Sequence, residues 1–182
     1  MSVQEALHYI ERHDLVARLW NQDHAIWAAT PRAIENSLGW LTIADQMAGN
    51  TSGLSTFASQ IKNDGFQDIV VLGMGGSSLV SEVLRSAFPK RQGFPALRVL
   101  DSTIPQSIRQ MEELLDLRNS LFVIASKSGN TAETLFLYQY FRDRIETVVG
   151  VHKAGDHFIA ITDQGSPLEH LATEANFRHV FI

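Results

Sequence analysis

Residues 121–134 read LFVIASKSGNTAET, and this stretch decides which fold the sequence predicts. The apolar run at 121–125 is typical of a buried strand, whereas apolar residues at helical spacing from Leu135 to Ile145 indicate a helix. The segment between them, residues 126–134, is rich in hydroxyl groups. Backbone N–H groups at a helix N-terminus carry partial positive charge and favour an anion. We therefore predict that residues 126–134 form a phosphate-binding loop.

A second polar loop, residues 73–78, reads GMGGSS and follows the apolar run at 69–72. Its glycines allow the backbone to pass close to a ligand, and Ser77 can offer both its N–H and its hydroxyl to an anion. Ordinary helix capping is an alternative for both loops. Ser77 and Ser78 can act as N-caps, and the spacing of Asn130 and Glu133 fits a capping box.

From residue 66 onward, short apolar runs alternate with segments of helical periodicity. Strands are predicted at residues 69–72, 97–100, 121–125, 158–161 and 179–182. This alternation predicts an α/β fold, namely a three-layer, doubly wound parallel sheet of five strands with helices on both faces. Helical faces between the strands are expected to pack inward through Leu79, Val80, Val83, Leu84, Phe88, Ile108, Met111, Leu115, Leu137, Phe141, Ile145, Leu168, Leu171 and Ala172.

The two polar loops follow the first and third predicted strands. In open α/β sheets, ligands bind beyond the carboxyl ends of the strands, at the point where the strand order reverses. For the order 2-1-3-4-5, this point lies between strands 1 and 3. We therefore expect both loops to hold one phosphorylated ligand. The loops after strands 2 and 4, residues 101–103 and 162–167, carry only ordinary turn and capping residues.

Residues 1–65 are predicted to form a helical extension, and residues 66–182 the α/β domain. One amphipathic helix is expected over residues 2–20. Thr30 and Pro31 are typical of an N-cap and a first helical position, which predicts a helix that continues toward Met47. Residues 49–53 read GNTSG and predict a break, and a further helix is expected over residues 54–61.

The composition excludes several classes of function. The chain of 182 residues has a net charge of −5, and no basic face suited to nucleic acid is visible. The absence of cysteine excludes disulfides and thiolate metal sites, and agrees with a cytoplasmic location. No signal peptide or membrane-spanning run is apparent, and the seven histidines lack ligand spacing. We therefore expect a soluble protein with no metal, no membrane anchor and no nucleic-acid partner.

A dinucleotide-binding loop is an alternative for residues 73–78, because they partly match the GxGxxG pattern and Asp101 follows the second strand. Two observations oppose it. Ser78 occupies the position of the last glycine or alanine, and the hydroxyl-rich loop at 126–134 has no role in such a site.

These motifs resemble those of the sugar isomerase (SIS) domain and, within it, of the glucose-6-phosphate isomerase family. Residues 71–77, VLGMGGS, resemble the family's Gly-x-Gly-Gly-Ser loop, and residues 125–134, ASKSGNTAET, resemble its phosphate loop. The resemblance covers residues 68–182. The opening segments RLW at 18–20 and LGWL at 38–41 are also similar to the isomerase part of bifunctional transaldolase/glucose-6-phosphate isomerase fusions.

The resemblance implies that Ser126, Lys127, Ser128 and Thr131 bind the substrate phosphate. It also implies that Gly75, Gly76 and Ser77 line the sugar side. The implied reaction is aldose–ketose isomerisation through an enediolate, with no cofactor, in glycolysis and gluconeogenesis. The family's catalytic arginine, glutamate, histidine and lysine are expected beyond Ile182. Within this chain Glu133 is a candidate base, and stabilisation of the first helical turn is the alternative role for its carboxylate.

The resemblance therefore predicts the sugar-phosphate-binding half of a longer isomerase, which binds sugar phosphate without turnover. Two alternatives remain open, a non-catalytic SIS sensor of sugar phosphates and a single-SIS isomerase that acts as an oligomer. A homodimer is compatible with each of these readings.

Overall fold

The computed structural model describes residues 1–31, 34 and 37–182. It divides into two compact units, Met1–Phe57 and Ala58–Ile182, and each is described by itself. The predicted domain boundary at residue 66 stays a prediction. Within the described residues, no helix combines the length and the apolar character that crossing a membrane requires.

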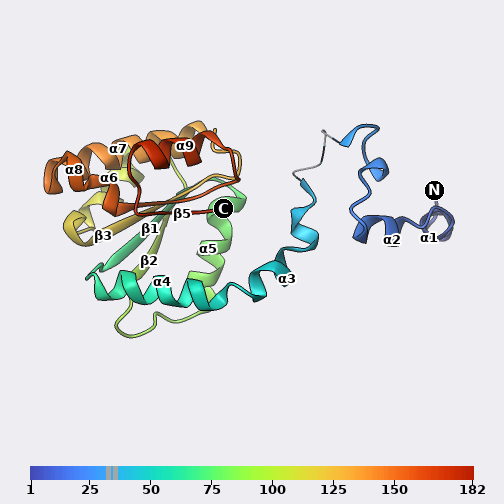
Figure 1. Ribbon diagram of the computed structural model, residues 1–182, viewed down its shortest axis with the longest axis horizontal. Coiled ribbons are helices and arrows are strands. Elements are labelled where there is room, and N and C mark those ends of the chain that lie inside the picture. Colours follow the sequence, from blue (N-terminus) through green and yellow to red (C-terminus); the bar gives the residue numbers. More distant parts are fainter. Residues whose placement is uncertain (32–33, 35–36) are drawn as a thin grey trace. The chain divides into compact units, whose positions relative to one another are not determined.

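The larger unit is built on one parallel sheet of five strands (Figure 1). The strands are β1 (Asp68–Gly73), β2 (Ala96–Leu100), β3 (Ser120–Ala125), β4 (Phe158–Ile161) and β5 (His179–Phe181). Their order is β2-β1-β3-β4-β5, and every neighbouring pair is parallel. The predicted strands and the predicted order 2-1-3-4-5 are therefore confirmed. The order reverses between β1 and β3, as the sequence-based hypothesis requires.

Helices cover both faces of this sheet, as Figure 1 shows. Helix α5 (Gly76–Ala87) lies on one face, and α6 (Pro105–Glu113), α7 (Ala132–Val149) and α9 (Pro167–Glu174) lie on the other. Short elements complete the connections, namely η5 (Leu117–Asn119), α8 (Val151–Ala154) and η6 (Gly155–His157). Pro105 opens α6 and Pro167 opens α9, where a missing N–H removes no helical hydrogen bond.

The main core lies between the sheet and helix α7. Successive strand residues point to opposite faces, so alternate positions of β1, β3 and β4 supply this core. Phe122 stacks on Phe141 of α7 and on Phe158 of β4, with ring centroids 4.6 and 5.5 Å apart. The predicted inward faces of α6, α7 and α9 are confirmed by the buried or partly buried side chains of Ile108, Met111, Leu115, Leu137, Phe141, Ile145, Leu168, Leu171 and Ala172.

The predicted inward face of α5 is wrong. Its apolar side chains are between 49% and 66% exposed, and they are Leu79, Val80, Val83, Leu84 and Phe88. The buried residue of this helix is instead Ser78, whose hydroxyl bonds the backbone at Gly75. Helical periodicity identifies an apolar face but not the direction in which the helix turns that face. That direction is set here by packing against β1 and β2.

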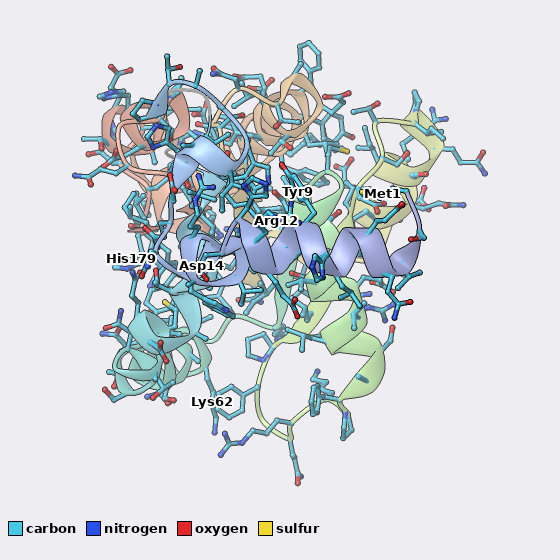
Figure 2. All side chains as sticks on the ribbon, turned by 90° about the vertical axis from the view of Figure 1, so that its right-hand side faces the viewer. Met1, Tyr9, Arg12, Asp14, Lys62 and His179 are labelled. Carbon is cyan, nitrogen blue, oxygen red and sulfur yellow. The ribbon has the colours of Figure 1, made fainter. Side chains whose placement is uncertain are left out.

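The smaller unit consists of short helices. In its described residues these include α1 (Val3–Arg12), α2 (Leu15–Trp20), η1 (His24–Ile26), η4 (Gly39–Leu41) and α3 (Ile43–Ala48). The single helix expected over residues 2–20 is therefore wrong. It is divided at Asp14, which follows α1 (Figure 2) and has a left-handed backbone with φ 48°. Helix α1 begins with a capping box, because Ser2 accepts from Glu5 N and Glu5 accepts from Ser2 N.

The helix predicted to run from Pro31 toward Met47 falls partly on Arg32, Ala33, Glu35 and Asn36, which lie outside the described residues. The described remainder forms η4 and α3 instead of one continuous helix. The next helix, α4, spans Thr51–Asn63 and begins inside the predicted break at 49–53. The helix expected over residues 54–61 is therefore confirmed and is longer than predicted.

Candidate functional site

The two polar loops leave the sheet side by side because β1 and β3 are neighbours. Gly73 and Ala125, the last residues of these strands, are partners in the register. A Cβ atom built on Gly73 would lie 3.1 Å from the carbonyl oxygen of Ala125 and 3.3 Å from Cβ of Ser77. Ser77 therefore sits close to the junction of the two strands, immediately beside the start of the loop that begins at Ser126.

The loop of residues 126–131 belongs to the segment predicted to bind phosphate and is called the phosphate loop below. It is closed by short-range hydrogen bonds. Ser126 Oγ lies 2.9 Å from Thr131 Oγ1, so the two ends of the loop meet through their hydroxyl groups. Gly129 N donates to Ser126 O at 3.2 Å, and Gly129 has φ +70°, a conformation that favours glycine. Ser126 is buried, whereas Lys127 and Ser128 are exposed. The four predicted phosphate ligands are thus gathered in one turn.

Helix α7 begins at the end of this loop without a capping box. Its N-cap is Thr131, whose side chain makes no capping hydrogen bond. The alternative in which Asn130 and Glu133 cap the helix is therefore wrong. Thr131 instead turns its hydroxyl to Ser126, so the first turn of an 18-residue helix opens toward the loop. Such a terminus carries partial positive charge and suits an anion.

The first loop also lacks the ordinary serine cap. Gly75 is the N-cap of α5, with φ 56° and ψ −124°, and the helix has no side-chain capping bond. Ser78 Oγ donates to Gly75 O at 3.0 Å and so holds the turn from inside the helix. Ser77 is half-buried, and Gly75 and Gly76 are exposed. The glycine backbone is therefore accessible, and Ser77 is partly so.

The loop after β4 contributes to the site in a way that sequence reasoning missed. Residues 162–167 do provide turn and capping chemistry, since Glu169 N donates to Ser166 Oγ at 3.1 Å. They also hold the phosphate loop, because Asp163 N donates to Lys127 O at 3.1 Å. The ion pair between Lys127 Nζ and Asp163 Oδ2 is long, at 3.9 Å, and both side chains are about half exposed, so it adds little stability. No pattern in the local sequence predicts these contacts.

Two further groups near the phosphate loop belong to the first turn of α7. Glu133, the candidate base, is exposed. Thr134 is fully buried, and its Oγ1 is the buried side-chain oxygen for which the described part of the chain provides no hydrogen-bond partner. A buried hydroxyl without a partner costs roughly 1–3 kcal/mol of desolvation. Substitution of Thr134 can therefore show whether its hydroxyl only lowers the stability of the chain or contacts a ligand.

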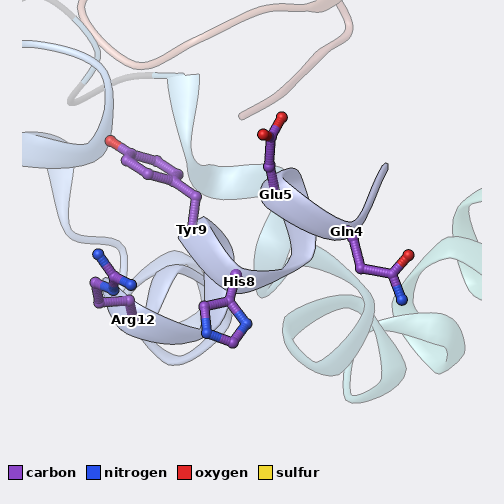
Figure 3. Close-up of a pocket in the computed structure, with 5 residues that line it drawn as sticks. All are labelled: Gln4, Glu5, His8, Tyr9 and Arg12. Carbon is purple, nitrogen blue, oxygen red and sulfur yellow. The ribbon is translucent and has the colours of Figure 1, made fainter. Parts of the chain in front are cut away.

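Other parts of the described chain offer fewer groups that could bind a metal or another ligand. Among residues 1–31, 34 and 37–182, no group of three or more His, Asp or Glu side chains is placed to hold a metal ion. A shallow hollow runs along α1 and is lined by Gln4, Glu5, His8, Tyr9 and Arg12 (Figure 3). All five lining residues belong to one exposed helix, so this hollow lacks the convergence of several elements that ligand sites show.

Comparison with known proteins identifies the family. A family model described as phosphoglucose isomerase matches residues 48–181. Glucose-6-phosphate isomerase of Citrifermentans bemidjiense is 30% identical over 157 residues, which cover 77% of this chain and 28% of that protein. The enzyme of the same name from Campylobacter jejuni is 31% identical over 117 residues, 64% of this chain and 28% of that protein. The chain thus spans little more than a quarter of these relatives' length.

Solved structures agree with this match. A hypothetical protein from Thermus thermophilus superimposes with a TM-score of 0.69 at 25% identity, over 99% of this chain and 41% of that one. A glucose-6-phosphate isomerase from Chlamydia trachomatis gives a TM-score of 0.66 at 25% identity, over 77% of this chain and 26% of that one. Sequence motifs, sheet order and these similarities converge, and the chain belongs to the phosphoglucose isomerase family.

Proposed function

We propose that this chain is the sugar-phosphate-binding part of a glucose-6-phosphate isomerase, which interconverts glucose 6-phosphate and fructose 6-phosphate. The observation that carries the proposal is the register of Gly73 with Ala125, which sets the glycine loop beside the phosphate loop. The isomerase relatives supply the reaction class. No transaldolase is among the similar proteins reported above, and a fusion to one is not proposed.

In this proposal the phosphate group binds to the loop at the start of α7. Ser128 donates a hydroxyl hydrogen bond, and Ser126 and Thr131 exchange the bond that joins their two hydroxyls for bonds to the phosphate. Lys127 contributes its backbone N–H or its ammonium group. Each hydrogen bond to a charged group is worth roughly 1.5–3 kcal/mol. Several such bonds are sufficient for micromolar-to-millimolar binding once the entropic cost of association is subtracted.

The sugar is proposed to extend from the phosphate toward Gly75, Gly76 and Ser77. Glycine backbone at this point leaves room for close approach of the hexose. The half-buried Ser77 is then placed to hydrogen-bond a sugar hydroxyl. With this assignment, one ligand contacts both loops at the point where the strand order reverses.

Isomerisation moves a proton between C2 and C1 through an enediolate. It requires a base for the proton and a positive group for the developing negative charge. Within this chain the carboxylate nearest in sequence to the phosphate loop is Glu133, which is exposed in the first turn of α7. Because the chain spans 28% of the first relatives' length, we propose that most of the proton chemistry depends on segments outside these 182 residues.

Titration of the chain with glucose 6-phosphate, followed by calorimetry or by amide chemical shifts, tests the binding site. Ser126→Ala and Thr131→Ala are each expected to weaken binding about tenfold or more, because each removes a hydrogen bond to a charged group. Thr147→Ala is the matched control, since Thr147 Oγ1 bonds the α7 backbone at Asp143 O. Binding that both site variants leave unchanged would sink the proposal.

A coupled assay addresses the reaction itself. The 182-residue chain is expected to bind glucose 6-phosphate without measurable turnover. Turnover at a rate typical of enzymes, abolished by Glu133→Gln, would contradict this expectation and assign the base to the chain. Cytoplasmic location and a homodimeric state stay predictions from the sequence.

A further inference from the structure

We propose that Thr162 and Ser166, in the loop after β4, are positioning residues that hold the phosphate loop in its anion-binding shape. This inference rests on the proposed phosphate-binding function and extends it to residues that neither the motifs nor the family match single out. Both side chains are buried, and Thr162 lies 35 positions from Lys127, the residue of the phosphate loop that it contacts.

A chain of hydrogen bonds leads from helix α9 to the phosphate loop. Thr162 Oγ1 donates to Lys127 O at 3.3 Å, and Thr162 Oγ1 lies 2.7 Å from Ser166 Oγ. Each hydroxyl has one proton. Since the Thr162 proton is directed to Lys127 O, the short contact requires that Ser166 donates to Thr162. Ser166 Oγ in turn accepts from Glu169 N at 3.1 Å, so the chain runs in one direction.

This chain fixes the orientation of one peptide plane in the phosphate loop. Lys127 O accepts from Thr162 Oγ1 and also from Asp163 N, at 3.3 and 3.1 Å. In a trans peptide the C=O and the following N–H point in opposite directions. Two bonds to Lys127 O therefore turn the N–H of Ser128 away from the loop after β4. In this proposal the anion lies on that side and accepts from Ser128 N.

Close packing supports the same arrangement at Gly129. A Cβ atom built there would lie 2.7 Å from Leu168 N and 3.0 Å from Ser166 Oγ. The backbone of Gly129 thus rests directly against the start of α9. The hydrogen bonds to Lys127 O and the close packing of Gly129 together hold the centre of the phosphate loop against the loop after β4 and the start of α9.

Thr162→Val tests the proposal because it keeps the side-chain shape and removes the hydroxyl. We expect it to weaken the binding of inorganic phosphate about five- to tenfold, the equivalent of one hydrogen bond. Thr162→Ser restores the hydroxyl and is expected to bind within about twofold of the unsubstituted chain. Thr173→Val is the matched control, since Thr173 Oγ1 bonds Glu169 O within α9.

The rescue by serine separates positioning from stability. Serine lacks the threonine methyl and so loses packing, whereas it keeps the bond to Lys127 O. The proposal is supported if phosphate affinity across the variants depends on the presence of the hydroxyl and not on the free energy of unfolding. Equal phosphate affinity in Thr162→Val and the unsubstituted chain overturns it, as does a failure of Thr162→Ser to recover affinity.

Ser126→Ala, measured in parallel, separates this inference from the proposed function. If Ser126→Ala weakens phosphate binding and Thr162→Val does not, only the positioning role fails. If neither affects it, the proposed site fails as well. If Thr162→Val does not fold, hydrogen exchange in the unsubstituted chain tests the proposal instead. Saturating phosphate is expected to slow exchange of the Asp163 amide, which donates to Lys127 O, and an unchanged rate overturns the proposal.

Discussion

Gly73 and Ala125 end two adjacent parallel strands in register, and a side chain at Gly73 would be in tight contact with Ala125 and Ser77. A Cβ atom on Gly73 would approach the Ala125 carbonyl oxygen to 3.1 Å. The two loops that we assign to one sugar phosphate begin at this pair. The distance between the loops therefore depends on a glycine that lies in the sheet and not in either loop's hydroxyl-rich part.

Substitution of Gly73 is expected to disturb both stability and binding. Gly73→Val forces atoms against Ala125 O and Ser77 Cβ, and such overpacking costs about 1–3 kcal/mol of the free energy of unfolding. Phosphate affinity is expected to fall as well, because the loops are pushed apart. Urea denaturation and phosphate titration measure the two effects.

The matched control for Gly73→Val is Gly53→Val in helix α4. A Cβ atom on Gly53 meets none of the described atoms within 4 Å, and valine has a better helix propensity than glycine. Stability is expected to stay equal or to rise by about a few tenths of a kcal/mol. If Gly73→Val were as stable as this control, the close contact at the strand ends would be wrong.

Gly129→Ala is expected to weaken phosphate binding more than its backbone strain alone explains. Its φ of +70° costs an alanine about 1–2 kcal/mol, and its Cβ would also collide with Leu168 N at 2.7 Å. Gly65→Ala has the same backbone cost at φ +86°, with no described neighbour within 4 Å. Comparison of the two variants by denaturation and phosphate titration measures the effect of the collision separately from that of the backbone strain. Equal stability losses, with phosphate affinity retained, would contradict the packing described for the loop.

Thr134→Val is expected to stabilise the chain. The substitution preserves shape and removes the buried Oγ1, for which the described residues offer no partner, and this raises the free energy of unfolding by about 1 kcal/mol. Thr147→Val, whose exposed hydroxyl bonds Asp143 O, is expected to change it by less than about 0.5 kcal/mol. Thermal or urea denaturation gives both values. A loss of phosphate affinity in Thr134→Val, with stability unchanged, would instead assign this hydroxyl to the ligand.

Alkaline stability is expected to depend on Tyr140. Its hydroxyl donates to Glu112 on α6, and this hydrogen bond, together with burial and the charge of Glu112, raises the pKa of Tyr140. A raised tyrosine pKa contributes stability that is fully present below the unfolded value of about 10 and is lost as pH rises through the folded value. Burial raises the pKa of Tyr138 in the same direction.

Denaturation curves measured from about pH 8 to pH 12 on the unsubstituted chain and on Tyr140→Phe test this dependence. The free energy of unfolding of the variant is expected to be lower at about pH 8 and to decline less steeply above about pH 10, because Tyr140, one of the tyrosines with a raised pKa, is gone. Glu112→Gln removes the charge that faces Tyr140 and should likewise reduce the slope. Identical slopes in all three proteins would show that the hydrogen bond does not form.

The sequence predicted the strands better than it predicted the helices around them. Strand positions followed from short apolar runs, and the two loops stood out because glycine and hydroxyl residues are concentrated there. The apolar residues of α5 form a clear helical face, yet Leu79 and its neighbours are exposed. Asp14 interrupts the predicted first helix through a left-handed backbone that aspartate adopts without any distinctive sequence signal.

The sequence by itself determined which residues form the five strands and where an anion is to be expected, because apolar periodicity and loop composition are local properties of the chain. Only the tertiary structure decided that Gly73 meets Ala125 and that Thr162 and Ser166 hold Lys127 and Gly129. These contacts join residues that are 35 or more positions apart. They depend on which strands pair and how α9 packs, and no local pattern encodes that choice.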